Sequence, residues 1–219
     1  FRISLRTIGL IMAFGGGVLI SAVSFDLVEE ASEKSSGHGW VIAGIFAGCL
    51  VCFGGDWLID HAGGSKRKDA HGGQADGSAL AIVLGSVLDG IPESMVIGLT
   101  IYEGGAVGAA YLAAVFISNL PESISSTSGL ATSGWAKSRI LCMWIAIAVV
   151  SGLASLAGYA LFQNSSPDTV AFVLAFAAGA ILTMLADTMM PEAFQHGGKL
   201  VGIMTTLGFA VAFTIHTLD

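Results

Sequence analysis

The amino-acid sequence predicts an all-α integral membrane protein, a polytopic helix bundle, and three observations support that prediction. Of the 219 residues, 54% are hydrophobic and 11% are charged, whereas an ordinary soluble domain carries about 25% charged residues. Long apolar stretches recur, each close to the roughly 20 residues that a helix needs to cross a bilayer. The polar segments between them are too short to fold alone. Residues 1–219 are therefore expected to form one transmembrane domain that contains a cytoplasmic loop at 62–77.

Seven stretches are long enough to cross the membrane as helices. In chain order they cover residues 7–30, 40–60, 78–102, 104–128, 139–163, 169–194 and 199–217. Basic residues lie in the loops or at the ends of these stretches, as Arg6, Arg139 and Lys199 illustrate. The four tryptophans fall near the expected membrane surfaces, where indole rings anchor a span; they are Trp40, Trp57, Trp135 and Trp144.

The distribution of basic residues predicts the orientation of the chain. With seven spans, one side of the membrane carries every Lys and Arg except Lys34. Because cytoplasmic loops are enriched in Lys and Arg, the N-terminus of this chain is expected in the cytoplasm and its C-terminus outside. The expected location is the plasma (inner) membrane.

Two segments of the chain resemble each other. Residues 14–21 (FGGGVLIS) match residues 176–183 (FAAGAILT), and at the same offset Glu30-Ala31 matches Glu192-Ala193. An odd number of crossings separates the copies, so they run in opposite directions, as in the inverted repeats of secondary transporters. Chance similarity between Gly- and Ala-rich helices is the alternative. The sequence predicts an inverted repeat that flanks two central helices.

Acidic residues within the predicted spans carry the functional argument. Asp89, Glu93, Glu122 and Asp187 fall inside apolar stretches that contain no Lys or Arg. An ionised side chain at the bilayer centre costs about 2.5–3.5 kcal/mol on the insertion scale. The compensating positive charge must therefore come from protons or from a bound cation.

The spacing of these acids favours a cation. Asp89 and Glu93 are four residues apart, so they share one face of a helix. Ser118 and Asn119 precede Glu122 by four and three residues, and both segments contain Pro-Glu-Ser. Carboxylates on facing helices build metal sites in bundle cores. The alternative is that the acids are protonated and bond across the bundle. Asp187 is a pathway ligand or a protonated helix-contact acid.

The two segments 89–93 (DGIPE) and 119–122 (NLPE) resemble the paired metal-site motifs of the ZIP (Zrt/Irt-like) divalent-metal transporters. The resemblance implies eight helices, of which the first is absent here, and an elevator-like alternating access. It also implies a divalent metal substrate, zinc or else cadmium, iron or manganese, held by Asp89, Glu93, Ser118, Asn119 and Glu122.

This chain departs from the family pattern at two positions of the first motif. Asp89 stands where the family has His, and Gly90 stands where it has Asn. The site therefore loses its imidazole and becomes an all-oxygen set. Zinc prefers nitrogen and sulfur ligands, whereas carboxylates and carbonyls suit Mg²⁺, Ca²⁺ and Mn²⁺.

Two other functions stay open at this point. The acids could serve a proton-linked transporter of a small organic solute, or less readily an intramembrane metal-dependent hydrolase, which would need several His ligands. The net charge of −7 excludes a nucleic-acid binder, and no nucleotide-binding loop is present. The chain is thus expected to be no enzyme, with lipid and transported metal ions as its partners. Gly-x-x-x-Gly spacings such as Gly44 to Gly48 would permit a homodimer.

Overall fold

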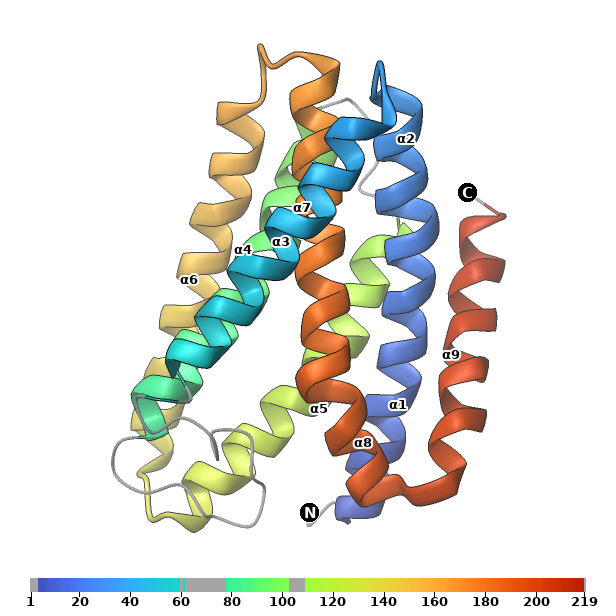
Figure 1. Cartoon of the computed structure of the whole chain (residues 1–219). Helices are drawn as coiled ribbons and strands as arrows, with labels where there is room; N and C mark the ends of the chain where they lie inside the picture. Colours follow the sequence, from blue (N-terminus) through green and yellow to red (C-terminus); the bar gives the residue numbers. More distant parts are fainter. Residues whose placement is uncertain (1–3, 60, 62–77, 103–108, 219) are drawn as a thin grey trace.

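The computed structural model describes residues 4–59, 61, 78–102 and 109–218, and every regular element in them is a helix (Figure 1). The predicted loop at 62–77 lies outside the described residues. The first rod consists of α1 (Leu5–Ala22), the π-helical η1 (Val23–Glu29) and α2 (Glu30–Lys34). The following helices are α3 (His38–Ile59), α4 (Ser78–Tyr102), α5 (Ala109–Thr132) and α6 (Lys137–Leu161). The last part comprises α7 (Pro167–Met184), the π-helical η3 (Leu185–Met189), α8 (Met190–Gly197), η4 (Gly198–Leu200) and α9 (Val201–His216).

Each predicted apolar stretch is helical over most of the residues that the structure describes, and the stretches 139–163 and 199–217 end in a turn. Within the described residues, five stretches are long and apolar enough to cross a membrane. They are Leu5–Lys34, Gly39–Ile59, Val83–Ile101, Lys137–Leu161 and Pro167–His216. The last contains both α7 and α9, because helical segments follow one another without a break from Pro167 to His216. Between α8 and α9, Gly198 has a positive φ of 63°, which glycine adopts readily. The number of seven crossings stays a prediction.

The outer surface of the bundle is apolar. Phe46 on α3, Leu141 on α6 and Ile203 on α9 are 64%, 60% and 65% exposed. Contiguous apolar surface of this kind marks contact with membrane or with another protein. Together with the apolar helices, it identifies the chain as a helical integral membrane protein.

Two rods of the bundle begin with the same signal. Ser4 caps α1 by accepting from the backbone N–H of Thr7, and Ser166 caps α7 by accepting from that of Thr169. Such caps satisfy backbone donors that a helix leaves unpaired. Each capped helix has 18 residues and continues into a π-helical segment. In Figure 1, α1 leads away from the N-terminal end and α7 runs back toward it.

Glycines let several pairs of helices pack at backbone distance, among them α1 with α9, α3 with α7, and α4 with α6. A Cβ atom on Gly17 would overlap the carbonyl of Thr205, and one on Gly208 would overlap the carbonyl of Phe14. Small residues are what allow helices to approach so closely in a membrane. Gly44 and Gly48 likewise contact the α7 backbone of the same chain. The predicted dimer motif at Gly44 and Gly48 is thus packed against α7 of the same chain in the described residues.

The core has two parts. The larger joins α1, α3, α7 and α9 and also takes in Val96, Leu99 and Tyr111 from α4 and α5. The smaller cluster comes from α5 and α6 and consists of Leu130, Ile140, Met143 and Ile147. Trp144 packs against this smaller cluster. Below, the helices α1, α3, α7 and α9 are called the packed bundle, and the helices α4, α5 and α6, which line the cavity described next, are called the site bundle. The larger cluster joins the two, because it includes residues of α4 and α5.

Candidate metal site

A cavity of about 410 Å³ lies between the three helices of the site bundle. It brings together three of the predicted site residues: Glu93 from α4 and Asn119 and Glu122 from α5. Further polar groups come from the serines of all three helices. They are Ser86, Ser94, Ser123 and Ser151. No Lys or Arg of the described chain is among the lining residues.

One hydrogen bond joins the two central helices inside this cavity. Nδ2 of Asn119 donates to Oε2 of Glu93 at 2.8 Å, and it also donates to the carbonyl oxygen of Val115 at 2.8 Å. These two bonds use both protons of the amide. The amide oxygen Oδ1 is then the Asn119 atom that is able to ligate a cation. The side chain thus both positions Glu93 and offers a ligand of its own.

Glu93 is deeply buried, with 2% of its surface exposed, whereas Glu122 is half-buried on the next helix. A buried carboxylate is strongly disfavoured unless donors or a cation compensate its charge. Asn119 supplies a donor to this carboxylate, which offsets part of that cost. The bond also links α4 to α5 at the cavity wall.

Asp89 and Ser118 lie close to the cavity without lining it. Both are buried, at 6% and 3% exposure. The hydroxyl of Ser118 donates to the carbonyl of Val115 in its own helix. Ser118 faces the packed bundle, because a Cβ on Gly15 of α1 would lie 3.1 Å from its Cα. The folded chain thus brings three of the six predicted site residues to the cavity wall.

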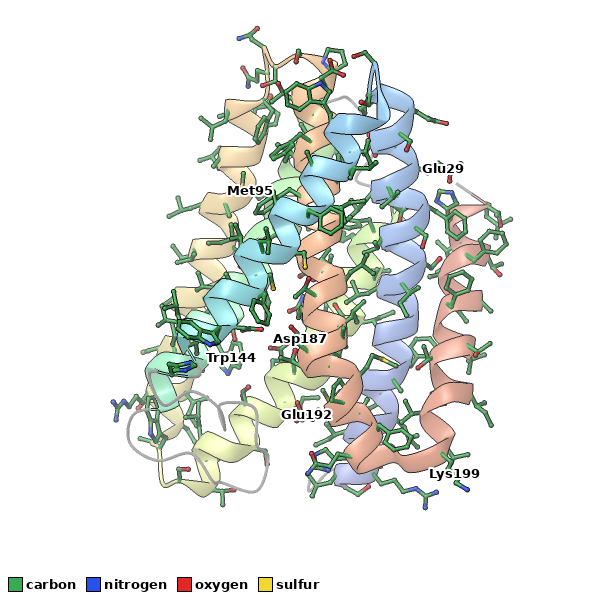
Figure 2. All side chains as sticks on the ribbon, viewed as in Figure 1. Glu29, Met95, Trp144, Asp187, Glu192 and Lys199 are labelled. Carbon is green, nitrogen blue, oxygen red and sulfur yellow. The ribbon has the colours of Figure 1, made fainter. Side chains whose placement is uncertain are left out.

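Asp187 lies on another rod, in the π-helical segment that follows α7. It is exposed and is not among the residues that line the cavity; Figure 2 labels it together with Trp144, which does line the cavity. Pro191 follows four residues later and has no N–H to donate to the carbonyl of Asp187. The altered backbone at this point has a local cause, but Asp187 is not part of the cavity wall.

Within the described residues, no three side chains of His, Cys, Asp or Glu gather closely enough to hold a metal ion. The donors at the cavity are instead two carboxylates, one amide oxygen and several hydroxyls. This set consists of oxygen ligands. Oxygen sets of this kind suit hard divalent cations that retain some water.

Sequence reasoning missed one contact that shapes the cavity. The indole Nε1 of Trp144 donates to Oγ1 of Thr127 at 2.8 Å and so joins α6 to α5. Trp144 is predicted only as an interface anchor, and no local pattern links it to Thr127. Buried Trp side chains generally have a hydrogen-bond partner for their N–H. This rule predicts that Trp144 has a partner, but it does not identify Thr127.

The chain is similar to two proteins named as zinc transporters. It is 26% identical over 214 residues to a putative zinc transporter of Arabidopsis thaliana, which covers 96% of this chain and 34% of that protein. It is 29% identical over 204 residues to zinc transporter GufA of Myxococcus xanthus, which covers 88% of this chain and 79% of that one. No family model matches the chain. The chain therefore spans about a third of the first relative and most of the second.

Proposed function

We propose that this chain is a ZIP-like secondary transporter that carries divalent metal cations across a membrane. The cation binds in the cavity of the site bundle, where Glu93 and Glu122 supply charge and Asn119 supplies an amide oxygen. Zinc is the first substrate to test, because both relatives are named as zinc transporters. Cadmium, iron and manganese are the further candidates.

The observation that supports the proposal most strongly is the meeting of Glu93, Asn119 and Glu122 in one cavity. These residues come from two helices, and the cavity receives no basic side chain from the described chain. A proton-linked carrier of an organic anion would need such a side chain. A divalent cation satisfies both carboxylates at once.

The cavity is larger than a bare ion requires. At about 410 Å³, it has room for several waters of roughly 30 Å³ each. We infer that the cation keeps part of its hydration shell and exchanges the rest for the carboxylates. Ser94 and Ser123 hold the retained waters. A partly hydrated ion held by a few protein ligands is bound weakly enough to be released, which suits transport, because the ion must also leave.

The proposal includes elevator-like alternating access. In it the site bundle, whose α4 and α6 are joined by glycine contacts, moves against the packed bundle, whose helices are joined in the same way. The matched starts of α1 and α7, which run in opposite directions, support an inverted repeat of the kind found in secondary transporters. In this proposal Asp89 lies behind the site, and Asp187 lines the path along the packed bundle.

The test is metal uptake into liposomes that contain the purified full chain and a metal-sensitive dye. Zn²⁺, Cd²⁺, Mn²⁺, Fe²⁺, Mg²⁺ and Ca²⁺ are compared. Glu93→Ala and Glu122→Ala are expected to abolish uptake, whereas Glu33→Gln, an exposed acid on α2, serves as the control with ordinary uptake. If folded protein transports none of these metals, the proposal is wrong.

A further inference from the structure

The cavity of the site bundle reaches the outer surface of the protein between α5 and α6. Four of the residues that line it are exposed, namely Leu112, Phe116 and Leu120 on α5 and Ala148 on α6. Phe116 keeps 65% of its surface exposed, whereas Glu93 on the inner wall keeps 2%. The cavity therefore runs from a buried carboxylate to an opening on the outside. We call this opening, bordered by the four exposed residues, the lateral mouth.

The lateral mouth forms where α5 and α6 diverge. The hydrogen bond between Trp144 and Thr127 joins the two helices at one end of the cavity. From there α5 runs toward the first rod (Figure 1), where a Cβ on Gly15 of α1 would lie 3.1 Å from the Cα of Ser118. Phe116 precedes Ser118 by two residues, and at 3.6 residues per turn it lies on the opposite side of the helix. Packing of α5 against α1 thus turns Phe116 outward.

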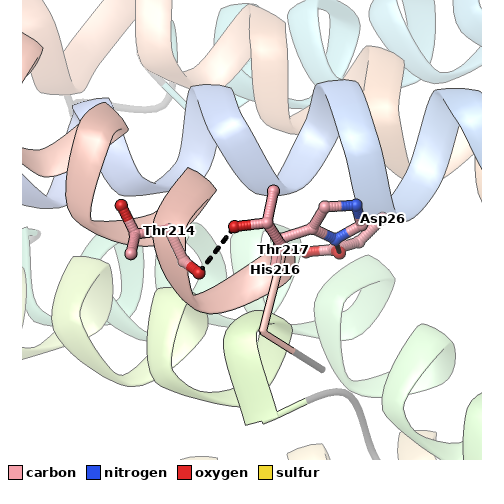
Figure 3. Close-up of polar contacts among 4 residues, drawn as sticks. All are labelled: Asp26, Thr214, His216 and Thr217. Atoms are coloured by element: carbon pink, nitrogen blue, oxygen red, sulfur yellow. Dashed lines mark hydrogen bonds and ion pairs between the residues drawn. The ribbon is translucent and has the colours of Figure 1, made fainter.

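Another boundary between rods is closed by its side chains. At the end of α9, Nδ1 of His216 donates to Oδ1 of Asp26 in the first rod at 2.8 Å (Figure 3). The ring of Phe25 lies against the imidazole, with 5.5 Å between the two centroids. The lateral mouth differs, because the exposed residues that border it in the described chain are all apolar. It therefore presents hydrocarbon to its surroundings.

The lateral mouth lies at the depth of the hydrocarbon core. The helix α6 is one of the stretches that are long and apolar enough to cross a membrane, and Ala148 is the twelfth of its 25 residues. The middle of a spanning helix lies within the hydrocarbon, which is about 30 Å thick. The lateral mouth therefore continues the apolar outer surface of the bundle, and the molecules next to it are lipids.

Size and lining decide which occupant fits. Two turns of an α-helix, about 10 Å wide and about 11 Å long, fill roughly 850 Å³, which is about twice the cavity volume of about 410 Å³. An ordered water needs about two to four polar partners, which the inner wall offers and the lateral mouth does not. A single hydrocarbon chain is thinner than a helix and gains dispersion contacts with the apolar wall.

We propose that the lateral mouth binds one acyl chain of a bilayer lipid. The chain lies against Phe116 and Leu120 and ends before the polar inner wall. Lipid tails are as apolar as leucine side chains, so close packing and not the hydrophobic effect holds the chain in place. The bound chain separates Glu93 and Asn119 from the bilayer and leaves the inner wall to water or a cation. This inference goes beyond the proposed function and does not depend on it.

The experiment measures how strongly lipids with brominated acyl chains quench the fluorescence of Trp144, which lines the cavity. The full chain is placed in nanodiscs of these lipids. The other indoles are removed by Trp40→Phe, Trp57→Phe and Trp135→Phe. Ala148→Phe fills the lateral mouth and is expected to lose most of the quenching. Ala146→Phe is the matched control and should keep the quenching, because Ala146 is exposed on the same helix and does not line the cavity.

A second variant changes the signal in the opposite direction. Phe116→Ala widens the lateral mouth and is expected to increase the quenching. Equal quenching in the parent protein, in Ala148→Phe and in Ala146→Phe overturns the site, because lipid at the general surface then accounts for the signal. Weak quenching together with a dimer in native mass spectrometry also overturns it, because a second copy then covers the lateral mouth. No metal is used, so failure of Zn²⁺ uptake would overturn the proposed function and leave this inference standing.

Discussion

The packed bundle and the site bundle are built from equally apolar helices but differ in how they fill their interiors. In the first rod, 67% of an apolar 18-residue window is buried, whereas the value is 28% for α3 of the same bundle, 33% for α4 and 22% for α6. Glycines bring backbones into contact in both bundles, but the site bundle also holds a cavity whose largely apolar wall carries two carboxylates, an amide and several hydroxyls. The comparison shows that close glycine packing is shared, and that the two bundles differ in the polar groups placed at the cavity.

The largest expected effect comes from adding one methyl group to each bundle. Gly208→Ala should destabilise the packed bundle by about 2 kcal/mol or more, because its Cβ would meet the carbonyl of Phe14. Gly90→Ala lines the cavity, where the nearest atom to a Cβ is Oγ of Ser151 at 3.5 Å. In a helix, Ala is about 0.5–1 kcal/mol more favourable than Gly, so this variant should be neutral or stabilised.

Thermal unfolding in detergent measures both variants. Gly202→Ala is a matched control on the same helix as Gly208, because a Cβ there meets nothing within 4 Å. Equal melting temperatures for Gly208→Ala and Gly202→Ala would contradict the close backbone contact between α9 and α1 at Gly208.

A smaller effect should separate function from stability in the site bundle. Glu122→Gln is expected to weaken Zn²⁺ binding by about tenfold or more, because a charge-assisted ligand becomes neutral. Its stability without metal should be unchanged or higher, since a membrane-embedded charge costs about 2.5–3.5 kcal/mol. Equilibrium dialysis and thermal unfolding of the same sample test this. A destabilised variant with normal binding would mean that Glu122 is structural.

The contact that closes the site bundle should contribute about 1 kcal/mol, the ordinary net value of a hydrogen bond. Trp144→Phe removes the indole N–H that donates to Thr127, and Thr127→Val removes the acceptor. A double-mutant cycle on unfolding free energies isolates this bond. Additive losses in the double variant would show that the bond does not hold α6 against α5.

The smallest effect concerns the loop that joins the first rod to α3. Hydrogen bonds from the backbone N–H and the hydroxyl of Ser36 lower the pKa of Asp168. A carboxyl group with a lowered pKa stabilises the folded state above its ordinary pKa of about 3.9. That contribution is lost as the pH falls through the lowered value.

Asp168→Asn should therefore melt slightly below the wild type at pH 7. The two should converge in acid, below the lowered pKa of Asp168. Melting temperatures across this pH range test the prediction, and a difference that persists in acid would assign the effect to packing instead of charge.

Local pattern was sufficient for the helices and for the shared face of two candidate residues. The stretch 78–102 coincides with α4, and the other predicted ends differ from the observed helices by a few residues. Asn119 and Glu122 line the same cavity, as expected from their spacing on α5, because helical periodicity is a local property. Asp89 and Ser118 have the same helical spacing to Glu93 and Glu122, yet they do not line the cavity. The packing of each helix against its neighbours decides which of its side chains reach the cavity, and spacing within one helix does not contain that information.

By itself, the sequence determined that this protein is helical and lies in a membrane, and it predicts a cation site among its acids. Composition and apolar run length carry that information, because the bilayer imposes both. The tertiary structure alone decided that Glu93 meets Asn119, that Gly208 touches the α1 backbone, and that His216 reaches Asp26 across 190 residues. Contacts between distant rods depend on how helices rotate and cross, and no local pattern encodes that choice.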